Sequence, residues 1–211
     1  MSFPRLYPLI DPSVLRARGI SIAAYAQLLR AAGVQLVQYR DKNAQSQDIL
    51  RNAKVIAEAF AGTDCRLIMN DRADLAVLAG FGGVHVGQDD LSPEDARHMV
   101  GLERWVGVST HNDEQVRLAD ISCTDYVAIG PVFATSTKRN AEPVVGLEGV
   151  RRARALTSRP LVAIGGITVE NAASVIDAGA DSVAVVGALL DLSASPAKMV
   201  RRFIEAMPPQ R

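Results

Sequence analysis

Short apolar segments alternate with longer segments of helical periodicity along the whole chain. Residues 21–32 illustrate the helices, because apolar side chains recur at helical spacing and Gly33 follows as a C-cap. Residues 161–164 illustrate the strands, because a short apolar run ends at two glycines. The pattern predicts strands at 6–10, 34–39, 66–69, 83–86, 105–108, the first half of 125–138, 161–164 and 182–186. It predicts helices at 21–32, 45–61, 73–79, from Ser92 onward, 113–119, 147–156, 169–178 and 196–206.

This alternation indicates one fold class. Strands that alternate with helices form a parallel sheet, and eight such units in 211 residues favour an α/β fold, a closed (β/α)8 TIM barrel with a single domain over 1–211. A doubly wound open sheet is the alternative. It is disfavoured because no GxGxxG motif follows the first strand, and because polar residues follow the second to eighth strands instead of gathering at one switch point.

Composition and charge narrow the expected partners to small molecules. The chain has 48% hydrophobic residues, Lys+Arg 23 against Asp+Glu 23, and no basic run, so neither nucleic acid nor a membrane surface is an expected partner. The N-terminus lacks a signal-peptide pattern and no apolar run reaches the length of a membrane span, so we expect a cytoplasmic protein. Cys65 and Cys123 stand apart without metal-type spacing and are expected to be buried, reduced thiols. Homo-oligomerisation stays open.

The residues that follow the predicted strands carry chemistry suited to anions and a metal ion. Asp71 and Asp90 follow neighbouring strands, a position suited either to holding Mg²⁺ or to capping the next helices. The glycines after the seventh and eighth strands lie where many barrels bind a phosphate through bare backbone, so we expect two anion subsites. The other polar or bare positions at these strand ends are Gln38, Arg40, Lys42, Asn70, Ser109, Thr135, Thr137, Lys138, Gly165, Gly166 and Gly187.

Six short motifs, in one order along the chain, carry a resemblance to a known family. They are QYRDK at 38–42, NDR at 70–72, VHVGQDD at 84–90, GVSTH at 107–111, GPVF at 130–133 with TSTK at 135–138, and GGIT at 165–168. Through these motifs the chain resembles the thiamine-phosphate synthases nearly from end to end. The resemblance implies a (β/α)8 barrel that joins hydroxymethylpyrimidine diphosphate to thiazole phosphate, with Mg²⁺ as the cofactor, giving thiamine phosphate and pyrophosphate.

The resemblance also implies roles for the matching residues. Asp71 and Asp90 would be the metal ligands. The catalytic residues would be Arg40, Lys42, Ser109 and Lys138, which together with Gln38 and Asn70 would bind the pyrimidine diphosphate. The thiazole phosphate would be held by Thr135, Thr137, Gly165, Gly166, Val186 and Gly187. Gly187 departs from the family, which often has serine there; the change removes one hydroxyl donor and keeps the backbone N–H.

The implied reaction needs no strong general base. Diphosphate would leave the pyrimidine through a cation-like state, stabilised by Mg²⁺ and the cationic side chains in a site that excludes water, and the thiazole nitrogen would then attack. A thiazole tautomerase on the same barrel and a non-catalytic phosphate-ligand binder are the alternatives. The presence of Asp90, Lys42 and Lys138 favours the synthase.

Three further positions carry structural expectations. Tyr39 alternates with Gln38 and Arg40 and is therefore expected to point away from the barrel interior and its mouth, the end where the strands finish, and toward the helices. His85 lies inside an apolar run, which is typical of a hydrogen-bonded histidine in the core or behind a site. The segment 131–146 is a long connection, and we expect it to become ordered over bound substrate, with slower proteolysis at Lys138 or Arg139.

Overall fold

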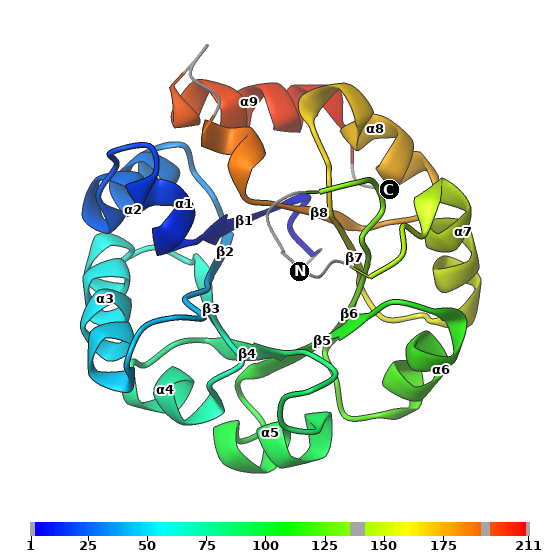
Figure 1. Ribbon diagram of the computed structural model, residues 1–211, viewed down its shortest axis with the longest axis horizontal. Coiled ribbons are helices and arrows are strands. Elements are labelled where there is room, and N and C mark those ends of the chain that lie inside the picture. Colours follow the sequence, from blue (N-terminus) through cyan, green and yellow to red (C-terminus); the bar gives the residue numbers. More distant parts are fainter. Residues whose placement is uncertain (1–2, 136–141, 191–194, 210–211) are drawn as a thin grey trace.

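The computed structural model describes residues 3–135, 142–190 and 195–209, and its strands form one closed barrel. Each strand pairs in parallel with the next, and β8 closes the ring on β1 with Leu6 opposite Val183. The helices surround the ring of strands (Figure 1). The strands are β1 Leu6–Ile10, β2 Leu36–Tyr39, β3 Arg66–Asn70, β4 Gly83–Val86, β5 Trp105–Thr110, β6 Tyr126–Ile129, β7 Leu161–Ile164 and β8 Ser182–Val185. The predicted barrel is confirmed, and the open sheet is excluded.

The helices that cover the barrel match the periodic segments of the sequence. They are α2 Ile22–Ala31, α3 Ser46–Ala59, α4 Ala73–Leu78, α5 Pro93–Val100, α6 Asp113–Ile121, α7 Gly146–Leu156, α8 Val169–Asp177 and α9 Pro196–Ala206. Two short helices were not predicted, α1 Pro12–Arg16 and the 3₁₀ helix η1 Gly187–Leu190. Asp11 begins α1 by accepting hydrogen bonds from the N–H groups of Ser13 and Val14, and Pro12 occupies its first position.

Alternating side chains divide each strand between two cores. Leu36 of β2 lies in a small cluster inside the barrel, whereas Val37 and Tyr39 lie in the large cluster between strands and helices. The Tyr39 hydroxyl is 3.2 Å from the Asn52 amide nitrogen of α3, so its predicted outward direction is confirmed. Gln38 therefore faces the barrel interior.

Aromatic side chains close the end of the barrel where the strands begin. Phe3, before β1, stacks on Trp105 at the start of β5 with ring centroids 5.3 Å apart. Both rings also lie against Tyr126, the first residue of β6, at 5.4 and 6.3 Å. Because this end is filled, a ligand has to approach the interior from the opposite end, where the strands finish.

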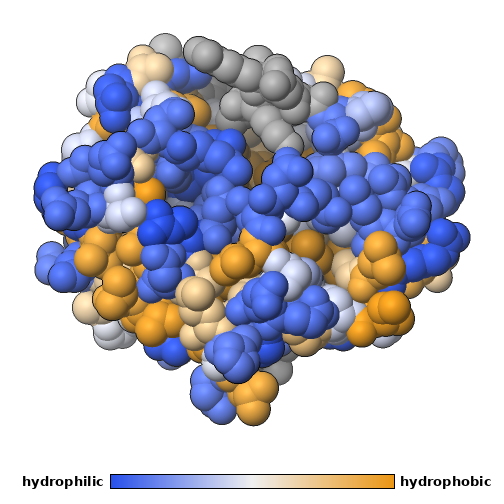
Figure 2. All heavy atoms as spheres, turned by 60° about the horizontal axis from the view of Figure 1, so that its bottom comes forward, coloured by the Kyte–Doolittle hydropathy of each residue, from blue (hydrophilic) through white to orange (hydrophobic). Residues whose placement is uncertain are grey.

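Hydrophilic and hydrophobic residues are interspersed over the face that Figure 2 shows, and no helix in the described part of the chain is long and apolar enough to cross a membrane. Cys65 and Cys123 are unpaired as predicted, but both are only partly buried. The expectation of buried thiols was wrong in this respect, because Cys65 lies in the loop before β3 and Cys123 in the turn after α6, neither within a strand.

Candidate functional site

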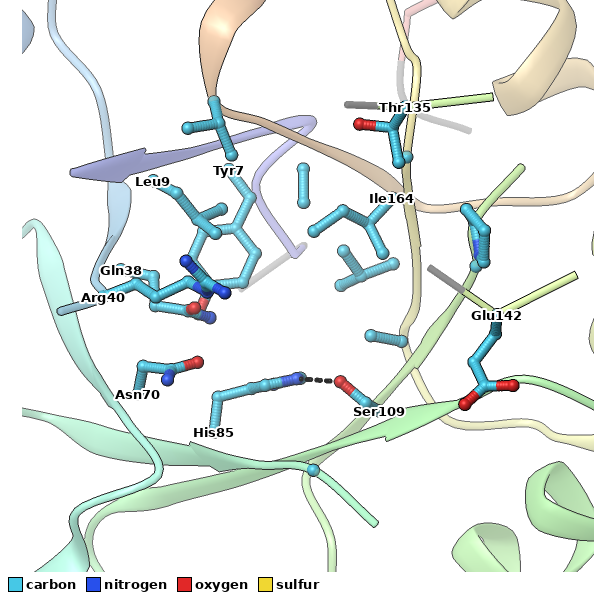
Figure 3. Close-up of a pocket in the computed structure, with 18 of the residues that line it drawn as sticks. Tyr7, Leu9, Gln38, Arg40, Asn70, His85, Ser109, Thr135, Glu142 and Ile164 are labelled. Carbon is cyan, nitrogen blue, oxygen red and sulfur yellow. Dashed lines mark hydrogen bonds between the residues drawn. The ribbon is translucent and has the colours of Figure 1, made fainter. Parts of the chain in front are cut away.

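A pocket of about 690 Å³ opens at the carboxyl ends of the strands. Every strand contributes to its wall, and Figure 3 shows these side chains converging from around the ring. One inward residue from each strand, in strand order, is Leu9, Gln38, Asn70, His85, Ser109, Ala128, Val162 and Ala184, and Tyr7 of β1 and Ile164 of β7 line the pocket as well. The parallel barrel thus brings residues that are far apart in the sequence to one place.

Most of the predicted site residues line this pocket. They are Gln38, Arg40, Lys42, Asn70, Asp71, Asp90, Ser109, Thr135, Gly165, Gly166, Val186 and Gly187. Thr137 and Lys138 lie outside the described residues, as does Arg139 in the segment predicted to become ordered. His111 and Glu142 also line the pocket, and neither was among the residues predicted for the site.

Two carboxylates and a lysine form the acidic side of the pocket. Lys42 Nζ lies 2.8 Å from Asp71 Oδ2. Burial raises the pKa of the Asp71 carboxyl; Lys42 opposes the rise by favouring the charged form, and Asp90 adds to it. The effect of Asp90 shows that the two carboxylates are neighbours whose negative charges repel.

Neither carboxylate caps a helix by its side chain. Arg72 is the N-cap of α4 and makes no side-chain cap hydrogen bond, and its guanidinium pairs with Asp74. Ser92, from which a helix was predicted to run, caps α5 by accepting a hydrogen bond from the Asp95 N–H. Asp90 instead accepts a hydrogen bond of 2.8 Å from the Gly87 N–H, which closes the turn after β4. The capping alternative for Asp71 and Asp90 is therefore not what the structure shows.

Arg40 is held by a carboxylate that the sequence analysis did not single out. Arg40 Nη1 lies 2.6 Å from Asp11 Oδ2, and Asp11 is buried after β1. The other oxygen of Asp11 accepts from the Ser13 N–H and begins α1. The same aspartate therefore fixes a helix and orients a cation at the pocket; the sequence showed only that a strand ends at Asp11-Pro12.

Asp11→Asn is expected to lower the free energy of unfolding by roughly 2 kcal/mol, because one amide oxygen still caps α1 while the amide nitrogen faces the guanidinium without an ion pair. Urea denaturation measures this. The control is Asp48→Asn, which breaks the exposed Asp48–Arg51 pair and is expected to cost less than about 0.5 kcal/mol. Equal losses of unfolding free energy in the two variants would show that the burial of Asp11 adds nothing to the stability that its ion pair provides.

Opposite the carboxylates, the backbone after β7 lies close to the chain after β6. Gly165 and Gly166 have φ of 102° and 63°, in the left-handed region that favours glycine. The Phe133 N–H donates to the Gly165 carbonyl at 3.0 Å. A Cβ atom on Gly166 would lie 2.5 Å from the Ala134 carbonyl oxygen, so only glycine fits beside the segment that leads to Thr135.

His85 occupies the floor of the pocket and is hydrogen-bonded at both ring nitrogens. Its Nδ1 is 2.9 Å from the Tyr126 hydroxyl. Its Nε2 is 2.8 Å from Ser109 Oγ, the hydrogen bond that is dashed in Figure 3. Burial is the main cause that lowers the pKa of His85 to about 4, so the ring is neutral near pH 7. The expectation of a hydrogen-bonded core histidine is confirmed.

His111 is also anchored. Its Nδ1 is 2.6 Å from the Gly130 carbonyl oxygen, and its backbone N–H donates to Gln115 Oε1 at 2.7 Å. It thus ties the start of α6 to the end of β6 at the pocket's edge.

A closed (β/α)8 barrel with a polar pocket at the carboxyl ends of its strands is the arrangement of barrel enzymes. The particular family follows from comparison: a family model described as thiamine monophosphate synthase matches residues 6–189, and the chain belongs to this family. It is 50% identical over 209 residues to the thiamine-phosphate synthase of Koribacter versatilis, covering 98% of this chain and 97% of that one.

Two further proteins agree with this assignment. The thiamine-phosphate synthase of Chloroflexus aurantiacus is 40% identical over 186 residues, which cover 88% of this chain and 85% of that one. Among solved structures, the thiamine phosphate pyrophosphorylase from Pyrococcus furiosus superposes with a TM-score of 0.84 at 26% identity, covering 96% of this chain and 94% of that one. The resemblance read from the sequence motifs is therefore confirmed at the level of the family.

Proposed function

We propose that the protein joins 4-amino-2-methyl-5-hydroxymethylpyrimidine diphosphate to 4-methyl-5-(2-phosphooxyethyl)thiazole, giving thiamine phosphate and pyrophosphate. Membership of the family supports the reaction. The observation that carries the proposal for this chain is that one pocket contains a carboxylate and cation cluster after β2 to β4 and a bare glycine backbone after β7 and β8. Two phosphorylated substrates need two such subsites.

The acidic side of the pocket fits Mg²⁺. Asp71 and Asp90 offer hard oxygen donors, and their mutual repulsion is the kind that a bound cation relieves. Within the described residues no group of three His, Cys, Asp or Glu side chains gathers, but Mg²⁺ is commonly held by one or two carboxylates together with water and phosphate oxygens. Asp71 and Asp90 would hold the ion, which when bound neutralises charge on the diphosphate.

The chain's own residues then stabilise the leaving group and exclude water. Arg40 and Lys42 bring positive charge to the diphosphate, and Ser109 supplies a hydroxyl; Lys138 has the same proposed role. Gln38 and Asn70 line the interior where the pyrimidine ring would lie. Leu9, Ala128, Val162 and Ala184 make the apolar part of the wall, which keeps water from a cation-like pyrimidine until the thiazole nitrogen attacks.

The thiazole phosphate would lie on the opposite side. Gly165 and Gly166 present backbone without side chains, and the turn from Val186 to Gly187 lies beside them at the pocket. Thr135, together with Thr137, would add hydroxyl donors. The thiazole ring would then lie between its phosphate and the pyrimidine.

The test is pyrophosphate release by purified protein given both substrates, with Mg²⁺ and with chelator. Release that requires both substrates and the metal ion is the expected result. Folded protein that binds thiazole phosphate and releases no pyrophosphate would overturn the proposal and favour a tautomerase or a phosphate-ligand binder.

A further inference from the structure

A continuous line of hydrogen bonds crosses the barrel interior along the floor of the pocket. Gln38 Nε2 donates to the Tyr7 hydroxyl at 3.0 Å, and the Tyr7 and Tyr126 hydroxyl oxygens are 2.9 Å apart. Tyr126 is 2.9 Å from His85 Nδ1, and His85 Nε2 is 2.8 Å from Ser109 Oγ. Gln38, Tyr7, His85 and Ser109 all line the pocket, whereas Tyr126 does not line it and is fully buried.

The number of hydrogens that each group carries determines which group donates in each hydrogen bond of this line. An amide nitrogen only donates, so Tyr7 accepts from Gln38. The hydroxyl of Tyr7 has one hydrogen, and Tyr126 is the other partner that the described residues offer it. Burial raises the pKa of both tyrosines, so both remain protonated phenols. The hydrogen of Tyr7 therefore points to Tyr126, and that of Tyr126 points to His85 Nδ1.

The same count fixes the state of Ser109. A neutral imidazole carries one hydrogen, and because Nδ1 of His85 accepts, the hydrogen is on Nε2. Nε2–H then donates to Ser109 Oγ. Ser109 accepts this bond, which leaves its own hydroxyl hydrogen to turn toward the pocket that it lines. If every bond ran in the reverse direction, Ser109 would donate its hydroxyl hydrogen to His85 Nε2. The hydrogen of Tyr7 would then have no acceptor among the described side chains.

We propose that His85 is a positioning residue that, as its Nε2–H tautomer, holds Ser109 as a hydrogen-bond donor to the ligand. The Tyr126 and Tyr7 hydroxyls set that tautomer. The inference rests on the proposed function for the identity of the ligand, since a donor at Ser109 suits an anionic phosphate oxygen and an acceptor there would repel it. It goes further in assigning Tyr126, which does not line the pocket, an effect on ligand binding.

The tautomer is measured directly by ¹⁵N NMR of protein with labelled histidine, which needs neither substrate nor activity. The chain has three histidines, and the signals missing from His85→Asn identify those of His85. The expected spectrum shows a protonated Nε2 and an unprotonated Nδ1. A hydrogen on Nδ1 would overturn the inference while leaving the proposed reaction untouched.

Ligand binding by variants shows whether Tyr126 acts on Ser109 through His85 or only stabilises the fold. Tyr126→Phe keeps the ring that packs on Phe3 and Trp105, and removes the hydroxyl that fixes His85. We expect the Kd for pyrophosphate with Mg²⁺ to rise roughly tenfold, the effect of weakening one hydrogen bond to a charged group. In a Ser109→Ala background, the same change is expected to alter the Kd less than about twofold, because the two residues act as a unit.

Tyr25→Phe is the matched control, because Tyr25 is fully buried and its hydroxyl has no partner among the described residues. It is expected to leave the Kd unchanged. Additive effects of Tyr126→Phe and Ser109→Ala, or an equal effect of Tyr25→Phe, would show that Tyr126 acts only on stability. Absence of any pyrophosphate binding by the unaltered protein would overturn the proposed function instead, and the NMR spectrum would still decide the tautomer.

Discussion

Asp90→Asn is expected to lower Mg²⁺-dependent turnover by roughly two to three orders of magnitude while the barrel stays folded. The substitution retains an oxygen that accepts from the Gly87 N–H, so the turn after β4 keeps its hydrogen bond. It removes one of the two neighbouring negative charges that would hold the metal ion. Turnover measured as pyrophosphate release over a range of Mg²⁺ concentrations tests this, with thermal unfolding as the check on folding.

Asp89→Asn provides a matched control in the same turn. Asp89 is exposed and adjacent in sequence, so the variant removes the same charge from nearly the same place. We expect it to retain turnover and its dependence on Mg²⁺. If Asp90→Asn were as active as Asp89→Asn at limiting Mg²⁺, Asp90 would not belong to the metal site, and its contribution would be the turn alone.

A second consequence of Asp90→Asn concerns its neighbour. Because Asp90 contributes to the raised pKa of Asp71, removing its charge is expected to move the pKa of Asp71 down, toward the value that Lys42 favours. The sign follows from repulsion: a carboxylate beside another negative charge keeps its proton to higher pH. Carbon NMR of the Asp71 carboxyl measures the direction of this change. An unchanged pKa of Asp71 would show that the charge of Asp90 does not act on it.

The strands were predictable from sequence because both of their faces are buried. A barrel strand meets the interior on one side and the helices on the other, so β7 appears as an uninterrupted apolar run. The boundary error at β2 has a local cause: Val34 continues the apolar pattern, but its N–H bonds to the Leu29 carbonyl and ends α2. The chain turns there, and pairing begins two residues later than predicted.

The polar residues at the strand ends were predictable for a related reason. A charged side chain immediately after a buried run is conspicuous in the sequence, and closure of the barrel brings such positions together. Asp71 and Asp90 were found in this way. The sequence could not exclude helix capping, because an aspartate after a strand suits both a cap and a metal ligand. The side-chain partners exclude capping, and the metal role is the proposal made above.

The supporting partners were hidden because they depend on tertiary proximity alone. Tyr7 and Tyr126 are 119 positions apart, and each looks like an ordinary aromatic residue of an apolar strand. Asp11 looked like the residue that ends a strand, and nothing local indicated that Arg40, 29 positions away, would lie against it. Alternation within β1 does place Tyr7 and Leu9 on the same face, which is the signal that could have directed attention to Tyr7.

Gly166→Ala is expected to lower kcat/KM for thiazole phosphate roughly a hundredfold, with a much smaller change in the KM for pyrimidine diphosphate. At φ of 63° an alanine is strained, and its Cβ would lie 2.5 Å from the Ala134 carbonyl oxygen and 2.7 Å from Phe133 Cβ. The segment before Thr135 has to move away, and the phosphate subsite moves with it. Steady-state kinetics with each substrate varied in turn measures the split.

Gly80→Ala separates backbone strain from displacement of the site. Gly80 has a similar φ of 68°, but nothing lies within 4 Å of an added Cβ, and it follows α4 away from the pocket. It should therefore destabilise the fold by about 1 kcal/mol and leave both KM values unchanged. If Gly166→Ala behaved like Gly80→Ala, the close approach of the backbone after β6 and β7 would serve stability only, and the thiazole phosphate would have to bind elsewhere in the mouth.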